Sequence, residues 1–217
     1  MKKLLLFSVL FILVAYRTST CKAQEKSPAL ANGLALTPPM GWNSWNSFQC
    51  TITEKIVKQM ADIMVSSGMA AVGYKYINVD DCWQNVNRTN GHVTTSSNFS
   101  FGIKSLADYV HGKGLKLGVY SCRGTKTCQE RAGSYSYETT DANDYAAWGV
   151  DYLKYDNCFE APGSNQQKDY EKMRDALKNS GRDIVFSICA WDFNTWAPNT
   201  GNLWRTAFDI YDEWPSL

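Results

Sequence analysis

The hydrophobic pattern alternates between short apolar runs and longer amphipathic segments. β-forming runs lie at 38–45, 74–79, 115–120, 150–156, 184–191 and 203–210. Segments with apolar residues at helical spacing lie between them, at 53–67, 101–111, 139–148 and 166–179. This rhythm predicts parallel βαβ units with right-handed crossovers. We therefore predict an α/β fold.

Helix boundary signals support these segments. Thr53 precedes the first amphipathic segment as a predicted N-cap, and Gly68 follows it as a predicted stop. In the third segment, Thr140 or Asp141 is expected near the cap.

Charged residues stand where the predicted strands end. Lys154 and Asp156 are two residues apart, so they project from the same side of a strand. A charged pair on a core strand is costly unless the strand end opens into a polar site. A purely structural ion pair is the alternative. Similar strand ends at 80–81 and 205–209 are typical of a (β/α)8 barrel, whose active site lies at the C-terminal ends of the strands.

The strand count is lower than a closed barrel requires. Such a barrel needs eight strands and usually about 250 residues, whereas about six strand-like runs are found here. We predict an incomplete (β/α)8 TIM barrel over residues 37–217, comprising about the first six βα units. A six-stranded open sheet is the alternative, but it would expose two apolar edges.

The N-terminal region has the pattern of a targeting segment. Two lysines precede the apolar run 4–15, which is too short to span a membrane comfortably. We predict a signal peptide at 1–23, a polar linker at 24–36, and a secreted or extracellular protein (periplasmic or in a lysosome-like lumen, depending on the host), free of the membrane after cleavage. Six of the seven cysteines would remain, and an oxidising compartment favours disulfides.

The composition gives no indication of nucleic-acid binding but is compatible with sugar binding. The chain has 217 residues, 20% of them charged, with a net charge of +1, so nothing in its charge indicates nucleic-acid binding. We find neither metal-ligand spacing nor a phosphate-binding glycine loop, and expect no metal and no cofactor. The aromatic content of 13% suits the apolar faces of sugar rings.

Five collinear blocks resemble the catalytic domain of glycoside hydrolase family 27, the melibiases, and its plant-like members most. The blocks are 36–45, 76–83, 113–120, 148–158 and 204–209. In that family the barrel continues through two more units into a C-terminal antiparallel β-domain, and this sequence includes neither.

The resemblance implies the catalytic roles. Asp156 would be the nucleophile and Asp209 the acid/base of a retaining exo-α-galactosidase acting on terminal non-reducing α-D-galactosyl residues. Retaining glycosidases form a covalent glycosyl intermediate and keep their two carboxyl groups ~5–5.5 Å apart. Lys154 would stabilise the Asp156 anion.

The resemblance also implies which residues bind the α-galactoside. They are Trp42 as an apolar wall, Asp80 and Asp81 at the 4- and 6-hydroxyls, Tyr120 against the nucleophile, Lys154 at the 3- and 4-hydroxyls, and Arg205 on the 2/3 side. A carboxylate that grips the axial 4-hydroxyl would reject glucose, because the wrong epimer leaves a buried charge unpaired.

The cysteines divide into two groups. Cys50 with Cys82, and Cys128 with Cys158, match the family's disulfides. Cys122 and Cys189 have no family partner in this chain and are expected to be buried thiols, with a bridge between them as the alternative.

Ala190 departs from the α-galactosidase pattern, which usually has a polar residue, often Glu, at this point. A small residue there is associated with α-N-acetylgalactosaminidases, although Phe193 could refill the space. The alternatives are therefore an α-N-acetylgalactosaminidase, or a catalytically impaired, truncated sugar-binding relative.

Overall fold

The computed structural model describes residues 30, 32–211 and 213–214. The predicted signal peptide at 1–23 and the first part of the predicted linker lie outside the described residues. Among the helices described, none is both long enough and apolar enough to cross a bilayer.

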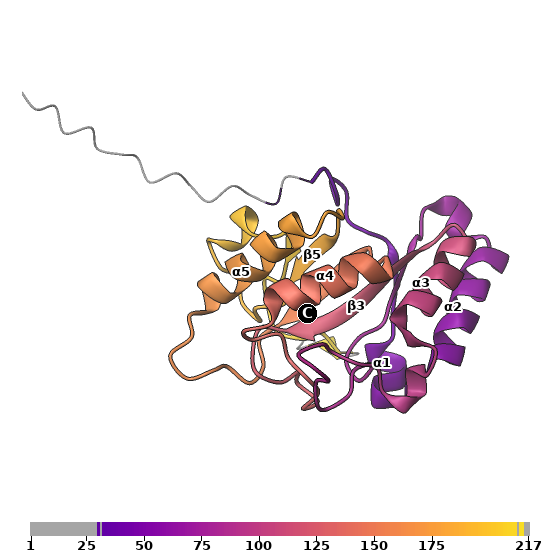
Figure 1. Cartoon of the computed structure of the whole chain (residues 1–217). Helices are drawn as coiled ribbons and strands as arrows, with labels where there is room; N and C mark the ends of the chain where they lie inside the picture. The colour runs from indigo at the N-terminus through magenta and orange to yellow at the C-terminus, as the bar shows by residue number, and fades with distance from the viewer. Residues whose placement is uncertain (1–29, 31, 212, 215–217) are drawn as a thin grey trace, which may run out of the picture.

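Six parallel strands form one curved sheet in sequential order, as expected for part of a TIM barrel (Figure 1). The register is continuous from strand to strand; for example, Cys122 pairs with Asp156. The strands are β1 (Gly41–Asn43), β2 (Tyr76–Asn78), β3 (Lys116–Cys122), β4 (Tyr152–Asp156), β5 (Val185–Ile188) and β6 (Leu203–Trp204). The predicted parallel βαβ arrangement is confirmed.

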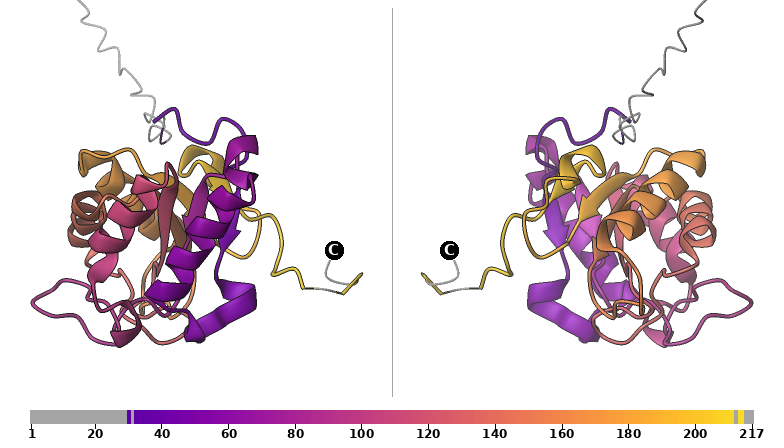
Figure 2. Two further views of the ribbon diagram at one scale, coloured as in Figure 1. Left: turned by 90° about the vertical axis from the view of Figure 1, so that its right-hand side faces the viewer. Right: turned by 90° about the vertical axis from the view of Figure 1, so that its left-hand side faces the viewer.

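Helices fill the connections between strands and pack on one face of the sheet, as the side views show (Figure 2). The helices are α1 (Trp45–Phe48), α2 (Glu54–Ser66), α3 (Gly102–Gly112), α4 (Glu138–Trp148) and α5 (Gln166–Asn179). Thr53 caps α2 as predicted, since its side chain accepts a hydrogen bond from the Ile56 amide at 3.3 Å. Gly68 follows with a positive φ of 84°, which favours glycine.

The start of α4 differs from the prediction. Tyr137 stands at the N-cap and makes no side-chain cap bond, so neither Thr140 nor Asp141 caps the helix. Asp141 is fully buried and instead receives both Nη groups of Arg88 at 2.6 Å. The carboxylate of Asp141, which was predicted to cap the helix locally, therefore forms a long-range ion pair with Arg88 instead.

The last predicted strand is also shorter than expected. Run 203–210 contributes only Leu203 and Trp204 to the sheet, where they pair with Ser187 and Ile188 of β5. The Arg205 amide still donates to the carbonyl of Ile188, the last residue of β5, at 3.0 Å, and residues 206–211 then leave the sheet as an irregular segment (Figure 2).

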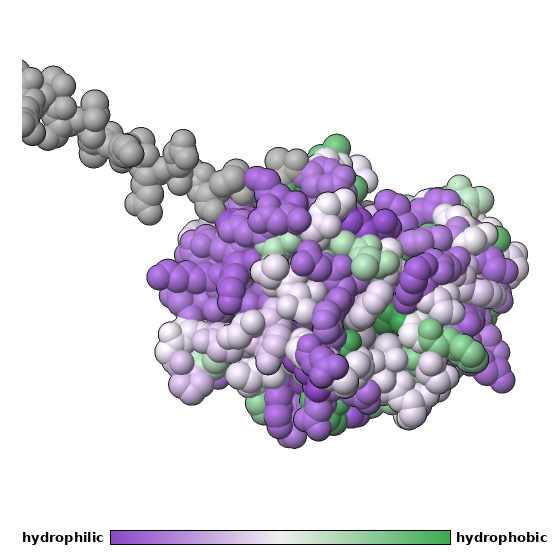
Figure 3. All heavy atoms as spheres, viewed as in Figure 1, coloured by the Kyte–Doolittle hydropathy of each residue, from purple (hydrophilic) through white to green (hydrophobic). Residues whose placement is uncertain are grey.

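The core lies between the sheet and its helical layer. Side chains of the strands meet those of the helices in a single buried cluster, which includes Val57, Ile77, Leu106, Leu117, Val119, Tyr145, Leu153, Met173 and Phe186. The opposite side of the helices is mainly hydrophilic on the face seen in Figure 3. This amphipathic division is what holds the helices on the sheet.

The described end of the predicted linker is docked against the sheet. Asn32 donates to the carbonyl of Ile184 at 3.1 Å and accepts from Asn202 at 2.9 Å. Leu30 is buried against the core. This arm ties the entry to β1 to the bases of β5 and β6.

Candidate active site

A pocket of about 300 Å³ lies at the C-terminal ends of the strands. The loops that follow these strand ends lie at the lower end of Figure 1. Seven of the eight side chains expected to bind or transform a sugar line the pocket: Asp80, Asp81, Tyr120, Lys154, Asp156, Arg205 and Asp209. They come from the ends of β2, β3, β4 and β6, so the parallel topology alone brings them to one edge.

Asp156 ends β4 and is buried, at 7% exposure. Its Oδ2 accepts from the Tyr120 hydroxyl at 3.0 Å. Its Oδ1 accepts from the indole of Trp191 at 2.9 Å and from the Asn157 amide at 2.8 Å. Three donors aimed at two oxygens stabilise the carboxylate anion and fix its orientation.

Tyr120 serves as a donor because it keeps its proton. Burial raises the pKa of its hydroxyl well above the usual value, and the negative charge of Asp156 raises it further. The hydroxyl also lies 3.1 Å from the sulfur of Cys128, so it connects Asp156 to the pocket wall.

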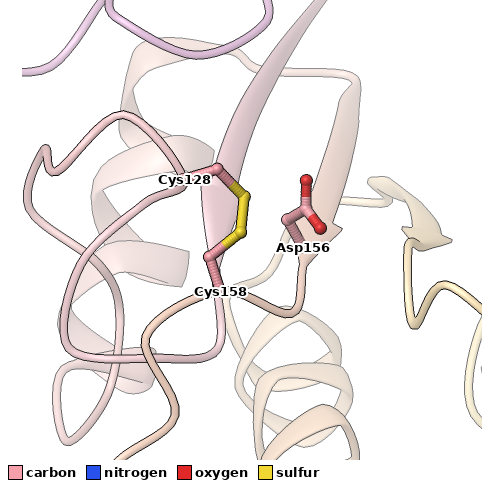
Figure 4. A group of neighbouring side chains, drawn as sticks. All are labelled: Cys128, Asp156 and Cys158. Carbon is pink, nitrogen blue, oxygen red and sulfur yellow. A yellow bond between two sulfur atoms is a disulfide. The ribbon is translucent and has the colours of Figure 1, made fainter.

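Disulfides Cys50–Cys82 and Cys128–Cys158 both form, as the resemblance implied. The second joins the loop after β3 to the segment after β4, directly beside Asp156 (Figure 4). Its sulfurs and the carboxylate lie within 4.8 Å of one another. Because the sulfurs are bonded to each other and are not thiolates, this cluster is a pocket wall and not a metal site.

Lys154 and Asp156 both line the pocket, as their same-side spacing predicted, but Lys154 forms its ion pair with Asp80. Its Nζ lies 2.8 Å from Asp80 Oδ2, which also accepts from Asn43 at 2.9 Å. Burial is the largest influence on the pKa of Lys154 and lowers it, but the charges of Asp80, Cys189 and Asp156 together outweigh burial, so the net pKa is raised. Lys154 is therefore a fixed cation at the pocket floor.

Asp81 is almost fully buried and is held by the backbone. Its oxygens accept from the amides of Cys82 at 2.7 Å and Gln129 at 2.9 Å. Burial raises the pKa of Asp81, and these hydrogen bonds offset only part of that increase. The bond to Gln129 anchors the loop that carries Cys128.

Asp209 occupies the outer rim of the pocket. Its side chain is 80% exposed and accepts from Arg205 at 2.6 Å. Arg205 also donates to the sulfur of Cys189 at 3.5 Å. Asp156 and Asp209 thus differ sharply in environment, one enclosed by donors and the other open to water.

Trp42 does not line the pocket. It packs against Phe48, with ring centroids 6.0 Å apart, at the edge of the core. Trp45 and Trp191 line the pocket in its place. Strand alternation explains the difference, because Trp42 lies inside β1 and faces the helical layer, whereas Trp45 follows the strand end.

Five residues at the site were missed in the sequence. Trp45, Gln129 and Trp191 line the pocket. Asn43 and Ser44 hold Asp80, Ser44 by accepting from the Asp80 amide at 2.9 Å. All but Gln129 lie at the end of a predicted strand run, and that position was the available signal.

Among the described residues, the cysteines outside these bridges are Cys122 and Cys189, which are free and buried, as expected. The Cys122 thiol donates to the carbonyl of Cys158 at 3.0 Å. Burial raises the pKa of each thiol to about 12, so both stay protonated.

Ala190 is 4% exposed, belongs to the hydrophobic core, and is absent from the pocket lining. Trp191, the next residue, enters the pocket instead, from a backbone with a positive φ of 69°.

The family model described as alpha galactosidase A matches residues 37–217. The chain belongs to this family. It is 52% identical to alpha-galactosidase 2 of Arabidopsis thaliana over 99% of this chain and 56% of that protein. It is 57% identical to the alpha-galactosidase of Coffea arabica over 87% of this chain and 51% of the relative. The chain therefore spans about half the length of these curated relatives.

Solved structures agree with the family. Alpha-galactosidase I from Mortierella vinacea superimposes with a TM-score of 0.79 at 41% identity, covering 84% of this chain and 48% of that one. The alfa-galactosidase of Saccharomyces cerevisiae, solved with raffinose, gives a TM-score of 0.81 at 36% identity, covering 86% and 43% respectively. These relatives confirm that the six strands are part of a TIM barrel.

Proposed function

We propose that the protein carrying this chain is a retaining exo-α-galactosidase that hydrolyses terminal α-D-galactosyl residues. The observation that carries the proposal is Asp156, a buried carboxylate at a barrel strand end with three donors on its two oxygens. A nucleophile must be fixed in place, and these three hydrogen bonds fix both oxygens of the Asp156 carboxylate.

The two carboxylates divide the chemistry. Asp156 attacks the anomeric carbon while Asp209 protonates the departing glycosidic oxygen, which leaves a covalent glycosyl-enzyme. Asp209 then accepts a proton from water, and the resulting hydroxide displaces Asp156 with overall retention. The exposure of Asp209 suits the second step, because its carboxylate is open to the attacking water.

Selectivity for galactose is assigned to the floor of the pocket. Asp80 and Asp81 are 2% and 1% exposed, and Lys154 neutralises the first of them. A substrate hydroxyl that reaches these groups gains a charge-assisted hydrogen bond, and an epimer that cannot reach them leaves the groups without it. The axial 4-hydroxyl of galactose is the group that meets this requirement.

Relatives and chemistry support this assignment. The yeast relative solved with raffinose binds a sugar with a terminal galactosyl unit, and the chain shares that relative's fold at 36% identity. Two disulfides suit the secreted location that the 1–23 segment predicts.

The test begins with hydrolysis of nitrophenyl α-galactoside, α-glucoside and α-N-acetylgalactosaminide. We expect cleavage of the galactoside, with the α-anomer as the first product by NMR. Preferential cleavage of the N-acetylgalactosaminide would instead favour the alternative that Ala190 raised.

The nucleophile is tested by covalent trapping. A 2-deoxy-2-fluoro-galactoside with a good leaving group should label Asp156, and Asp156→Ala should abolish turnover. Asp108→Asn is the matched control, since Asp108 is an exposed helical carboxylate paired with Lys104 and should be silent. Label on a carboxylate other than Asp156 would overturn the assignment.

A further inference from the structure

Arg123 is a buried cation next to the nucleophile strand. It is the first residue after β3, and its side chain is 2% exposed. A guanidinium without water is costly unless all its donors are engaged, so its partners should reveal what the residue does.

All its side-chain partners lie on the segment that follows Asp156. Nη1 donates to Asp169 at 2.7 Å and to Ser164 at 3.3 Å, and Nη2 donates to Glu160 at 2.6 Å. Nε donates to the side-chain oxygen of Asn157. One planar group therefore clamps three residues of the β4–α5 connection and Asp169 in the first turn of α5.

The backbone around Arg123 follows the same segment. Its amide donates to the carbonyl of Asp156 at 3.0 Å, and the Thr125 amide donates to that of Phe159 at 3.0 Å. Between them, Gly124 approaches so closely that a Cβ would lie 2.0 Å from the Cys158 oxygen. The two strand ends therefore stay in contact past the sheet.

Asn157 completes the connection to the site. The side-chain oxygen of Asn157 accepts from Arg123, while the backbone N–H of Asn157 donates to Asp156 Oδ1 at 2.8 Å. Holding the Asn157 side chain restrains the backbone of Asn157. The peptide plane is therefore held with its N–H directed at the Asp156 carboxylate. Glu160 and Asp169 already balance the charge of Arg123, so its effect on Asp156 is geometric.

We propose that Arg123 is a positioning residue for the Asp156 carboxylate, acting through Asn157. The proposal rests on the proposed function, in which Asp156 must approach the anomeric carbon along a defined line. Lysine should not replace Arg123, because an ammonium cannot hold Asn157, Glu160 and Asp169 in one planar fork.

The experiment compares Arg123→Lys with Arg88→Lys in the protein carrying this chain. Arg88 is a matched control: it too is largely buried, pairs with a buried aspartate, and contacts no residue that lines the pocket. We expect R123K to lower kcat about 10- to 100-fold with KM within about twofold, and R88K to leave both nearly unchanged. Amide hydrogen exchange should accelerate over 157–165 in R123K only.

Asn157→Ala provides the second arm and keeps the ion pairs of Arg123 with Glu160 and Asp169. It should reproduce the kcat defect, and the R123K/N157A double variant should be little worse than either single one, because both break the same connection. Defects that multiply, or unchanged exchange at 157 in R123K, would overturn the proposal. If R123K fails to fold, a normal kcat in N157A overturns it equally.

The two proposals fail differently. A wild-type protein that cleaves no α-galactoside contradicts the proposed function, while the exchange of the 157 amide still decides whether Arg123 positions it. An active wild type with an unaffected R123K contradicts the positioning role alone.

Discussion

At the residue scale, the site depends on how Asp156 is held. Its donors come from three separate places, the hydroxyl of Tyr120, the amide of Asn157 and the indole of Trp191. Trp191 carries its indole on a positive-φ backbone, an uncommon conformation for a bulky residue. Such a conformation persists only where the surroundings enforce it, and at Trp191 it accompanies the contact with the carboxylate.

Trp191→Phe tests that contact. The change keeps the apolar ring but removes the donor on Asp156 Oδ1, and a hydrogen bond to a charged group is worth about 1.5–3 kcal/mol. We expect kcat/KM for an α-galactoside to fall about 10- to 100-fold. Trp148→Phe is the control, because Trp148 packs on Trp83 and Tyr145 away from the pocket. Equal effects of the two changes would refute the role of the indole.

The free thiols give a prediction in pH. Because burial raises the pKa of Cys122 and Cys189 to about 12, thiolate is scarce at pH 8, and iodoacetamide should modify neither in the native protein. Peptide mapping should find both modified after denaturation without reduction. Unfolded thiols titrate near 9.0, so the free energy of unfolding should fall as pH rises from about 9 to about 12. Rapid native alkylation would contradict their burial.

At the scale of elements, close strand contact decides where glycine is needed. Gly41 pairs with Tyr76 across β1 and β2, and a Cβ at Gly41 would lie 2.1 Å from the Tyr76 carbonyl oxygen. The obstacle is backbone of the adjacent strand, so it cannot rotate away as a side chain would.

Gly41→Ala should therefore lower the free energy of unfolding by about 3 kcal/mol, as overpacking against a rigid neighbour does. Gly112→Ala in α3 is the contrast: nothing lies within 4 Å of its added Cβ and its φ is not positive, so it should be neutral or stabilise by up to ~1 kcal/mol. Urea unfolding of the two variants measures the difference. A neutral Gly41→Ala would show that β1 is not held against β2 as described.

At the scale of the whole molecule, two disulfides tie the loops at the C-terminal end of the sheet. Cys50–Cys82 and Cys128–Cys158 close sequence separations of 32 and 30 residues. They join loops on neighbouring strands, so they restrain the pocket rim as well as the unfolded chain.

Replacing either cysteine pair by serine should lower the free energy of unfolding by about 3–4 kcal/mol in the chain-entropy model, and by similar amounts because the loops are similar in length. Denaturant unfolding of the two double variants tests this. Stability unchanged by either replacement would mean that the bridge is not formed in solution.

The sequence by itself determined the order and type of most elements, because their causes are local. Apolar spacing at 3.6 residues located α5 at Gln166–Asn179, and Thr53 marked the start of α2 through its own cap bond. The parallel topology followed from the βα rhythm, and it placed Asp80, Asp156 and Asp209 at one edge. The family resemblance gave the disulfide pairs, which the structure confirms, and the roles proposed for these carboxylates.

Only the tertiary structure decided which partner each polar group takes. Lys154 is two residues from Asp156 but bonds Asp80, seventy-four positions away. Asp141 was predicted near a helix cap but pairs with Arg88. A buried charge takes the partner that packing brings within reach, and nearness in sequence does not specify which that is. The same holds for Arg123. Nothing in the sequence distinguishes it from an ordinary loop residue, and only the fold places it against the segment that follows Asp156.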